Sequence, residues 1–122
     1  MLSRASLARP RKRNAPRPAW KVAKAYGQWL RGRSCACEGR NPDCRGPIQA
    51  AHVPHPQSSG TATKAADQHQ IPLSYACHID TQHRIGWKSF AALYLAGADP
   101  TELAERYWLA WPGRPRWENQ HA

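Results

Sequence analysis

Four cysteines and a set of histidines are the residues of this chain whose types and spacing could do chemistry. Three cysteines fall close together in a turn-rich stretch, and the fourth directly precedes a histidine; they are Cys35, Cys37, Cys44 and Cys77. Free thiols in a reducing compartment are more often metal ligands than disulfide partners, and four thiolates suit the tetrahedral preference of zinc. The sequence therefore predicts a structural zinc site. Because Cys35-x-Cys37 is not the usual Cys-x-x-Cys knuckle, three thiolates plus water or histidine are the alternative.

Three histidines stand where catalysis on a phosphate could use them. His52 closes a short strand-like stretch, and His78 and His83 follow the next such stretch at the start of a helical pattern. An imidazole with a pKa of about 6.5 can take up a proton at neutral pH. A metal ion can stabilise both a pentavalent phosphate and its leaving oxygen. A single loop histidine is usually only a solvated or hydrogen-bonded side chain, which is how we interpret His55 and His121.

The order of these residues resembles that of the HNH nuclease family. The first block of the family is similar to Gln49-Ala50-Ala51-His52-Val53, and the second to Ile71-Pro72-Leu73-Ser74-Tyr75-Ala76-Cys77-His78, continuing to Gln82-His83-Arg84-Ile85-Gly86-Trp87. The resemblance covers about residues 34–90 and is closest to small phage and prophage members. It implies a ββα-metal core, treble-clef-like, that holds one divalent ion (Mg²⁺, Mn²⁺ or Zn²⁺). It also implies that His52 is the general base and that His78 and His83 bind the ion.

The spacing of the two histidine ligands departs from the family pattern. Four residues separate His78 from His83, whereas the family has three, which puts both ligands on one helical face. A local bulge, or a helix that begins only after His78, is therefore required. Ser74 stands where many members of the family have a further cysteine.

The third metal ligand is the second departure. Ala51 stands where many HNH proteins have a metal-binding Asp or His just before the general base. The remaining candidates are Asp67, His55 and His69. We expect Asp67 to bind the ion. His69 falls where the middle Asn of the pattern often lies, and we expect it to orient His52 as part of the catalytic site.

The charge of the chain favours a polyanionic partner. Lys and Arg outnumber Asp and Glu by 18 to 8, which gives a formal net charge of +10. No apolar run approaches the roughly 18 residues that a membrane span needs, so DNA and not a membrane is the predicted partner. The candidate contacts to DNA are Arg11, Lys12, Arg13, Lys64 and Arg84. Residues 114–117 could also bind a DNA backbone, or could equally be a solvated tail.

The pattern of apolar residues predicts an α+β fold with three parts: a disordered basic arm over 1–18, a nuclease domain with flanking helices over 19–112, and a tail over 113–122. The capping box Asp99-x-x-Glu102, with Pro100 between, marks the start of a last helix with a buried tryptophan face. The other predicted elements are a helix over 19–32, a zinc-braced loop over 34–46, strands over 47–53 and 70–73, a mobile loop over 54–68, and a metal-binding helix after Ser74.

These observations predict a metal-dependent endonuclease that hydrolyses phosphodiester bonds in DNA, for phage-type DNA processing or recombination. The alternative is a non-catalytic zinc-containing module that binds nucleic acid with a degenerate HNH fold, which has no chemical use for His52 beside His78 and His83. A third hypothesis, a basic assembly protein, leaves the histidines incidental. Because no apolar segment follows the N-terminal arginines, we expect a cytoplasmic protein, in the host cell if phage-encoded. The oligomeric state is left open.

Overall fold

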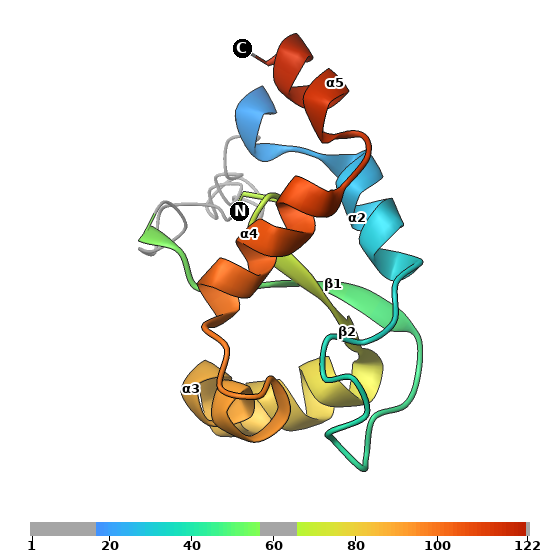
Figure 1. Cartoon of the computed structure of the whole chain (residues 1–122), viewed down its shortest axis with the longest axis vertical. Coiled ribbons are helices and arrows are strands. Elements are labelled where there is room, and N and C mark those ends of the chain that lie inside the picture. The colour runs from blue at the N-terminus through green and yellow to red at the C-terminus, as the bar shows by residue number, and fades with distance from the viewer. Residues whose placement is uncertain (1–16, 57–65, 122) are drawn as a thin grey trace, which may run out of the picture.

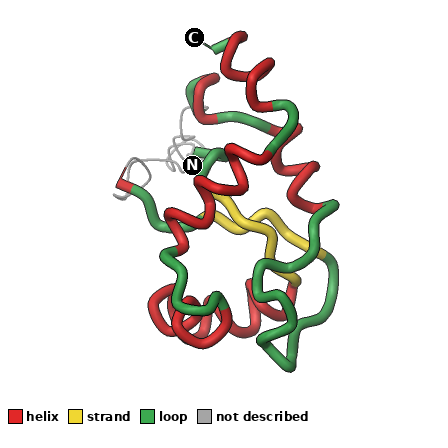
Figure 2. The backbone as a smooth tube through the Cα atoms, in the orientation of Figure 1, coloured by secondary structure: helices red, strands yellow, loops and turns green. Residues whose placement is uncertain are grey.

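The computed structural model describes residues 17–56 and 66–121, which fold around a two-stranded ribbon (Figure 1, Figure 2). Most of the predicted arm lies outside the described residues, as do Arg11, Lys12, Arg13 and Lys64. Within the described ranges, every helix is too short or too polar to cross a membrane. The elements are, in chain order, η1 (Ala19–Lys21), α2 (Lys24–Arg31), β1 (Ile48–His52), β2 (Gln70–Ser74), η3 (Ala76–Gln82), α3 (His83–Tyr94), α4 (Pro100–Ala110) and α5 (Arg114–Gln120).

The ribbon confirms the predicted α+β class and both predicted strands. β1 and β2 pair antiparallel, with His52 opposite Gln70 at one end. Because side chains alternate between the faces of a strand, Gln49 and Ala51 share one face of β1, and Ala50 and His52 share the other. Ala51 packs in the core on the α3 side, whereas Ala50 packs toward α2. The two faces of the ribbon therefore carry different cores.

The loop that carries the first three cysteines runs along the outer edge of β2. The N–H of Ala36 donates to the carbonyl of Pro72 at 2.8 Å. In an antiparallel strand the N–H and C=O of one residue point the same way, so the missing N–H of Pro72 falls on this outer edge and removes no bond to β1. Gly46 then turns the loop back with φ of 92°, where a Cβ would lie 3.0 Å from that of Tyr75. Only glycine fits there without strain.

The predicted first helix is wrong in its first turn. Its place is taken by the 3-10 turn η1 and by two non-helical residues, Val22 and Ala23, before α2 begins. Asp67 holds this break: its N–H donates to the carbonyl of Lys21 at 2.8 Å, and its carboxylate accepts from the N–H of Ala23 at 2.9 Å. Tertiary hydrogen bonds thus replace the helical ones that the apolar spacing favours.

The helix after β2 begins with a bulge, which is one of the two arrangements that the histidine spacing allows. η3 is a π-helix, in which the N–H of residue i+5 bonds to the carbonyl of residue i, and the N–H of His83 indeed donates to the carbonyl of His78. The wider turn absorbs the one extra residue between the two histidines. α3 then continues the chain, with Gly86 in a left-handed conformation (φ 85°) one turn in.

The start of α4 confirms the predicted cap. The side chain of Asp99 accepts from the N–H of Thr101 at 3.1 Å, and Pro100 occupies the first turn. The predicted inner face is also present, since Ala104 and Trp108 are buried. α4 lies across β2 in Figure 1 and contacts both cores.

The segment predicted as a tail contains the short helix α5. The indole Nε1 of Trp117 donates to the carbonyl of Val22 at 3.0 Å, and its ring packs edge-on against Trp108 with centroids 5.2 Å apart. The C-terminal segment is thereby attached to the break between η1 and α2.

Two groups of buried side chains hold these elements together. The cysteine-side core lies between the ribbon, the cysteine loop and α3, and the tryptophan-side core lies between α2, α4 and α5. The main buried residues of the cysteine-side core are Cys35, Cys37, Ala51, Val53, Ile71, Leu73, Cys77, Phe90, Ala91 and Leu95. Those of the tryptophan-side core are Ala23, Tyr26, Leu30, Trp108 and Trp111, with Trp117 against them.

Candidate functional site

The four cysteines meet where the first loop, the end of β2 and the start of η3 come together. Their sulfur atoms all lie within 4.8 Å of one another, and Cys35, Cys37 and Cys77 are buried. Four thiolates around one zinc ion lie about 3.8 Å apart, since each Zn–S bond is about 2.3 Å and the geometry is tetrahedral. The predicted grouping is therefore confirmed, and the four cysteines could hold a metal ion such as zinc.

Polar groups around the sulfur atoms support this arrangement. The N–H of Ser74 donates to Cys35 Sγ, and the side-chain amide of Asn41 donates to Cys77 Sγ, both at 3.3 Å. The Ser74 hydroxyl accepts from the N–H of Cys77 and from the thiol of Cys44, both at 3.2 Å. Ser74 thus orients the ligands at a position where many HNH proteins have a cysteine. The role of Asn41 is one that the sequence pattern does not indicate.

Burial opposes the ionisation of two of these thiols. It raises the pKa of Cys35 to about 11 and also raises the pKa of Cys77. Burial acts in the same direction on Cys37, but the N–H groups of Asn41 and Gly39 outweigh it and lower the pKa of that thiol. Because thiolate is the form that binds zinc, a cation among the four sulfurs has to displace their protons. The cluster suits a structural ion better than a reactive cysteine.

The π-helical turn brings His78 and His83 together. Their ring centroids lie 4.7 Å apart with the planes at 75°. Nδ1 of His78 lies 2.7 Å from Oε1 of Gln49 on β1, so Nδ1 donates the hydrogen bond and Nε2 carries the lone pair. Burial, and then the charges of His83 and His52, lowers the pKa of His78, which keeps this ring neutral near pH 7. The pair could supply two imidazole ligands to a metal ion, and Gln49 of β1 orients one of them, His78.

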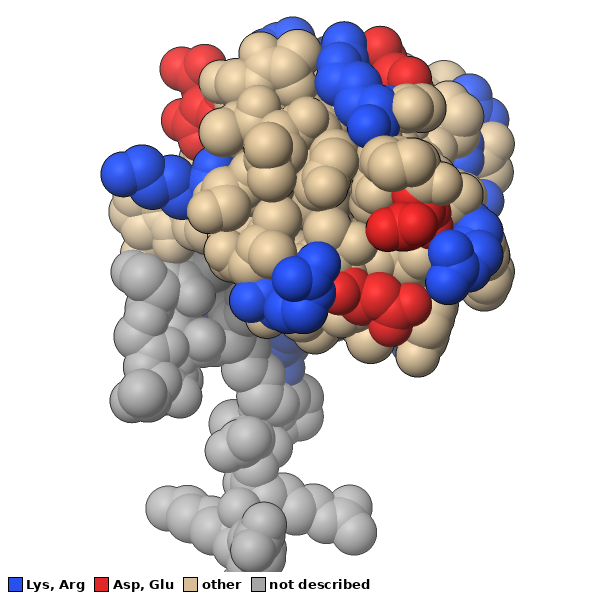
Figure 3. All heavy atoms as spheres, turned by 90° about the horizontal axis from the view of Figure 1, so that it is seen from below, with Lys and Arg blue, Asp and Glu red and all other residues tan. Residues whose placement is uncertain are grey.

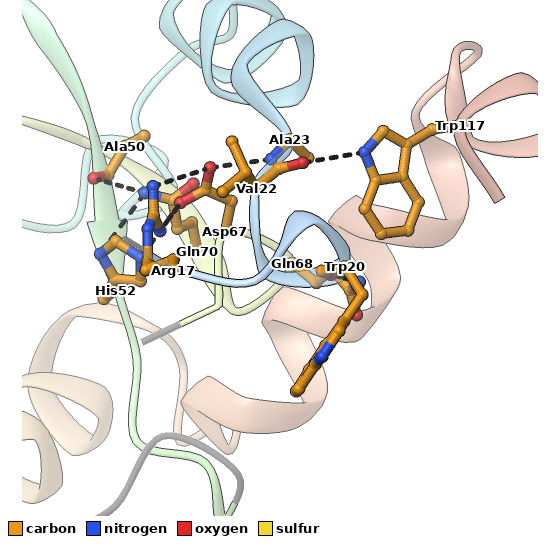
Figure 4. A network of polar contacts seen from close by, with 10 residues as sticks. All are labelled: Arg17, Trp20, Val22, Ala23, Ala50, His52, Asp67, Gln68, Gln70 and Trp117. Carbon is orange, nitrogen blue, oxygen red and sulfur yellow. Dashed lines mark hydrogen bonds and ion pairs between the residues drawn. The ribbon is translucent and has the colours of Figure 1, made fainter. Parts of the chain in front are cut away.

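His52 lies in a polar network at the end of β1 (Figure 4). Its Nε2 is 3.6 Å from Oδ1 of Asp67, and its Nδ1 is 3.5 Å from Nε2 of Gln70. Asp67 also accepts hydrogen bonds from the guanidinium of Arg17 and from the N–H of Ala23. Burial raises the pKa of Asp67, but His52, Arg17 and the Ala23 N–H together outweigh it and lower the pKa to about 2. Asp67 is therefore a firmly ionised group beside His52.

Asp67 has partners other than those predicted from the sequence. Within residues 17–56 and 66–121, the four cysteines are the only group of three or more His, Cys, Asp or Glu side chains with ligand atoms within 4.8 Å of one another. Asp67 is thus not gathered with His78 and His83, because its oxygens serve Arg17 and the backbone of Ala23 instead.

His69, which we expected to orient His52, stacks on His55. The two ring centroids lie 3.6 Å apart, with the planes within 9° of parallel. Burial, and then the charges of His55, His52 and Lys21, lowers the pKa of His69 to about 4, so this ring is neutral at pH 7. The groups that face the ring nitrogens of His52 are Asp67 and Gln70.

Arg84 is the one predicted DNA contact within the described ranges. It is exposed at the start of α3, where its Nε donates to the carbonyl of Asp80 at 3.3 Å. Figure 3 shows the face at the α3 end, on which Lys and Arg are interspersed with Asp and Glu. Trp117, which could stack on a base if its ring were free, is half-buried against the tryptophan-side core and packs edge-on on Trp108.

Comparison of the chain with protein-family models, with curated proteins and with solved structures found no match. The resemblance to HNH nucleases therefore rests on the residues and their order. Any function has to be argued from the two sites themselves.

Proposed function

We propose that the protein is a metal-dependent endonuclease of the HNH type that hydrolyses phosphodiester bonds in DNA. The observation that carries this proposal is the histidine pair, with His78 and His83 4.7 Å apart and His78 held by Gln49. A purely structural zinc module has no chemical need for such a pair beside four clustered thiols. The π-helical turn that creates the pair is a rare conformation that is frequent at functional sites.

In this proposal, His78 and His83 hold one divalent ion, either Mg²⁺, Mn²⁺ or Zn²⁺. When bound, the ion supplies positive charge that stabilises the pentavalent phosphate and the leaving oxygen. Two imidazoles leave several positions for water and for phosphate oxygens of the substrate. The cysteine cluster, with a structural zinc, fixes the first turn of η3 against the end of β2 and so fixes His78 next to Gln49.

His52 is the proposed general base. It lies at the end of β1 on the face opposite Gln49, close enough for its charge to lower the pKa of His78. Nδ1 of His52 takes the proton from the water that attacks phosphorus, in place of its long 3.5 Å contact with the Gln70 amide, and the imidazolium formed keeps its Nε2–H toward the Asp67 carboxylate 3.6 Å away. Arg17 and the N–H of Ala23 hold that carboxylate in place and keep it ionised. We therefore assign Asp67 as a positioning residue for His52, in place of the metal ligand expected from the sequence.

A zinc-containing module that binds nucleic acid without cutting it is the second candidate. It is favoured by the absence, within the described ranges, of a third ligand beside His78 and His83, and by the burial of Ala51 at the usual ligand position. Imidazole is a good ligand for Zn²⁺ and other transition metal ions, and catalytic sites keep open positions for water and substrate, so a two-histidine site remains compatible with cutting.

Plasmid nicking tests the proposal, using wild type, His52→Ala and His83→Ala with Mg²⁺, Mn²⁺, Zn²⁺ or no added metal, and with folding checked by circular dichroism. His121→Ala is the matched control, because that ring stacks on Trp117 and bonds through Nδ1 to the Trp117 carbonyl 2.7 Å away, in the C-terminal segment. We expect wild type and His121→Ala to cut only with added metal, and both site variants to lose roughly 100-fold or more in rate. A folded wild type that binds DNA but cuts with no ion and no form of DNA contradicts the proposal and supports the second candidate.

A further inference from the structure

A groove beside α2 is lined in part by the two side chains that contact His52. It has a volume of about 320 Å³ and is lined by Lys24, Gly27 and Arg31 of α2 and, on the other side, by Arg17, Asp67 and Gln70. Asp67 and Gln70 are the two side chains that face the ring nitrogens of His52, as Figure 4 shows. Asp67 and Gln70 therefore belong both to the groove and to the surroundings of the proposed general base.

The α2 wall presents two cations on one side of the helix. Lys24 and Arg31 are seven residues apart, which is two helical turns, so they share a face. Both are exposed, whereas Tyr26 and Leu30 of the same helix are fully buried in the tryptophan-side core. This face of α2 is therefore turned to solvent, away from the core.

Arg31 covers Gly27, the small residue between these two cations. A Cβ at Gly27 would lie 3.6 Å from Nη1 of Arg31, so the guanidinium lies over the glycine, which is buried. Both Gly27 and Arg31 line the groove.

The electrostatic balance of the groove is positive. Its one carboxylate, Asp67, is already paired with Arg17. Within the described ranges, neither Lys24 nor Arg31 has a carboxylate oxygen within 4.0 Å, since the ion pairs there involve other residues. The two cations are thus available to an anionic ligand, and their spacing along α2 suits a linear series of charges.

We propose that this groove binds the phosphate backbone of DNA next to the bond that is cut, with Lys24 and Arg31 contacting phosphates on one side of the phosphate at His52. The choice of DNA rests on the proposed nuclease function. Binding can nevertheless be measured without cutting, so the two proposals can fail separately. Phosphate contacts of this kind fix the position of the strand and are not selective for base sequence.

Fluorescence anisotropy of a labelled DNA duplex, without added divalent metal and over a series of salt concentrations, tests this proposal. The groove variant is Lys24→Ala with Arg31→Ala. The matched control removes the same charge from exposed cations of α3 and α4 that do not line the groove, Lys88→Ala with Arg106→Ala. A third variant, Lys24→Arg with Arg31→Lys, keeps both charges.

We expect the groove variant to bind more weakly and the slope of log K against log salt to fall by about 2, which is about 1 for each phosphate that the variant no longer neutralises. The control and the charge-conserving variant should keep the wild-type slope. An unchanged slope in the groove variant, an equal decrease in the control, or a wild type that binds no DNA overturns the proposal. A wild type that binds through the groove but never nicks a plasmid leaves this inference standing and overturns only the nuclease function.

Discussion

The cysteine-side core and the tryptophan-side core lie on opposite faces of the same short ribbon and contain different kinds of side chain. The first contains thiols and small side chains, with Phe90 as its one aromatic ring among the fully buried residues described. The second packs Tyr26 against Trp108 and Trp111, with centroids 5.0 Å and 5.4 Å away. Aromatic rings each bury about 150–250 Å² and stabilise a fold on their own, whereas clustered thiols do so through an ion. We infer that only the cysteine-side core depends on metal.

The same division separates the proposed functions. The histidine pair and Gln49 lie against the metal-dependent core, while the α2 groove lies on the outer face of the tryptophan-side core. A protein that loses its zinc should therefore lose the catalytic geometry first.

Loss of the structural ion should have the largest effect. Cys37→Ser, or a strong chelator, removes a contribution on the order of 10 kcal/mol, which is comparable with the whole stability of a small domain. We expect circular dichroism to show loss of the native fold and elemental analysis to show loss of zinc. Ser34→Ala, an exposed change beside the cluster, is the control and should keep both. A Cys37→Ser protein that melts at the same temperature as wild type would contradict the inference that the cysteine-side core depends on metal.

Truncation of the central tryptophan should have the next largest effect. Trp108→Ala leaves a cavity between Tyr26 and Trp111 and should lower the free energy of unfolding by about 3–5 kcal/mol in urea titrations. Its zinc content should stay that of wild type, because no cysteine is touched. Leu109→Ala, at a side chain that is 54% exposed, should change stability by only about 0.5 kcal/mol. Zinc loss in folded Trp108→Ala would show that the two cores are not independent.

Asp67 should make a pH-dependent contribution to the free energy of unfolding. Its pKa of about 2 in the folded protein lies below the ordinary 3.8, so its stabilisation is fully present above pH 3.8 and is lost as the pH falls toward 2. This shift amounts to about 2 kcal/mol at neutral pH. We expect Asp67→Asn to be less stable than wild type by a constant amount above pH 5, with the difference shrinking below pH 4. Release of zinc by acid affects both proteins and cancels in the comparison, so a difference that grows on acidification would contradict this account of Asp67.

Removal of the α4 cap should have the smallest effect. Asp99→Ala loses the bond to the N–H of Thr101 and should cost about 1 kcal/mol, whereas Asp99→Asn keeps a capping group and should cost little. Because α4 contributes Ala104 to one core and Trp108 to the other, the loss should lower the melting temperature without changing zinc content. Equal melting temperatures for Asp99→Ala and Asp99→Asn would contradict the role of the cap.

The elements that the sequence predicted well are those with a local signal. The capping residue Asp99 and the two strands have such signals, and the fourth cysteine could be assigned to the cluster because it precedes a histidine in a recognisable order. Counting the residues between His78 and His83 predicted either a bulge or a helix that begins after His78, and the structure has the bulge.

The features that the sequence did not indicate depend on contacts between distant residues. The break before α2 exists because Asp67 binds the backbone 44 residues earlier, at Ala23. Gln49 lies in the first family-like block, but nothing in its spacing shows that it bonds to His78. Asp67 was a reasonable metal ligand by residue type, and only the fold shows that its carboxylate forms an ion pair with Arg17.

Two separate metal environments are proposed in one chain, a structural zinc among the four cysteines and a catalytic ion at His78 and His83. Zinc analysis combined with plasmid nicking can distinguish them. Wild type, His83→Ala and Cys37→Ser would be purified in parallel, analysed for bound zinc and assayed with and without added Mg²⁺ or Mn²⁺. The account predicts about one zinc per chain in wild type and His83→Ala, none in Cys37→Ser, and cutting only by wild type with added metal. Zinc that disappears in His83→Ala, or cutting by His83→Ala at the wild-type rate, would contradict it.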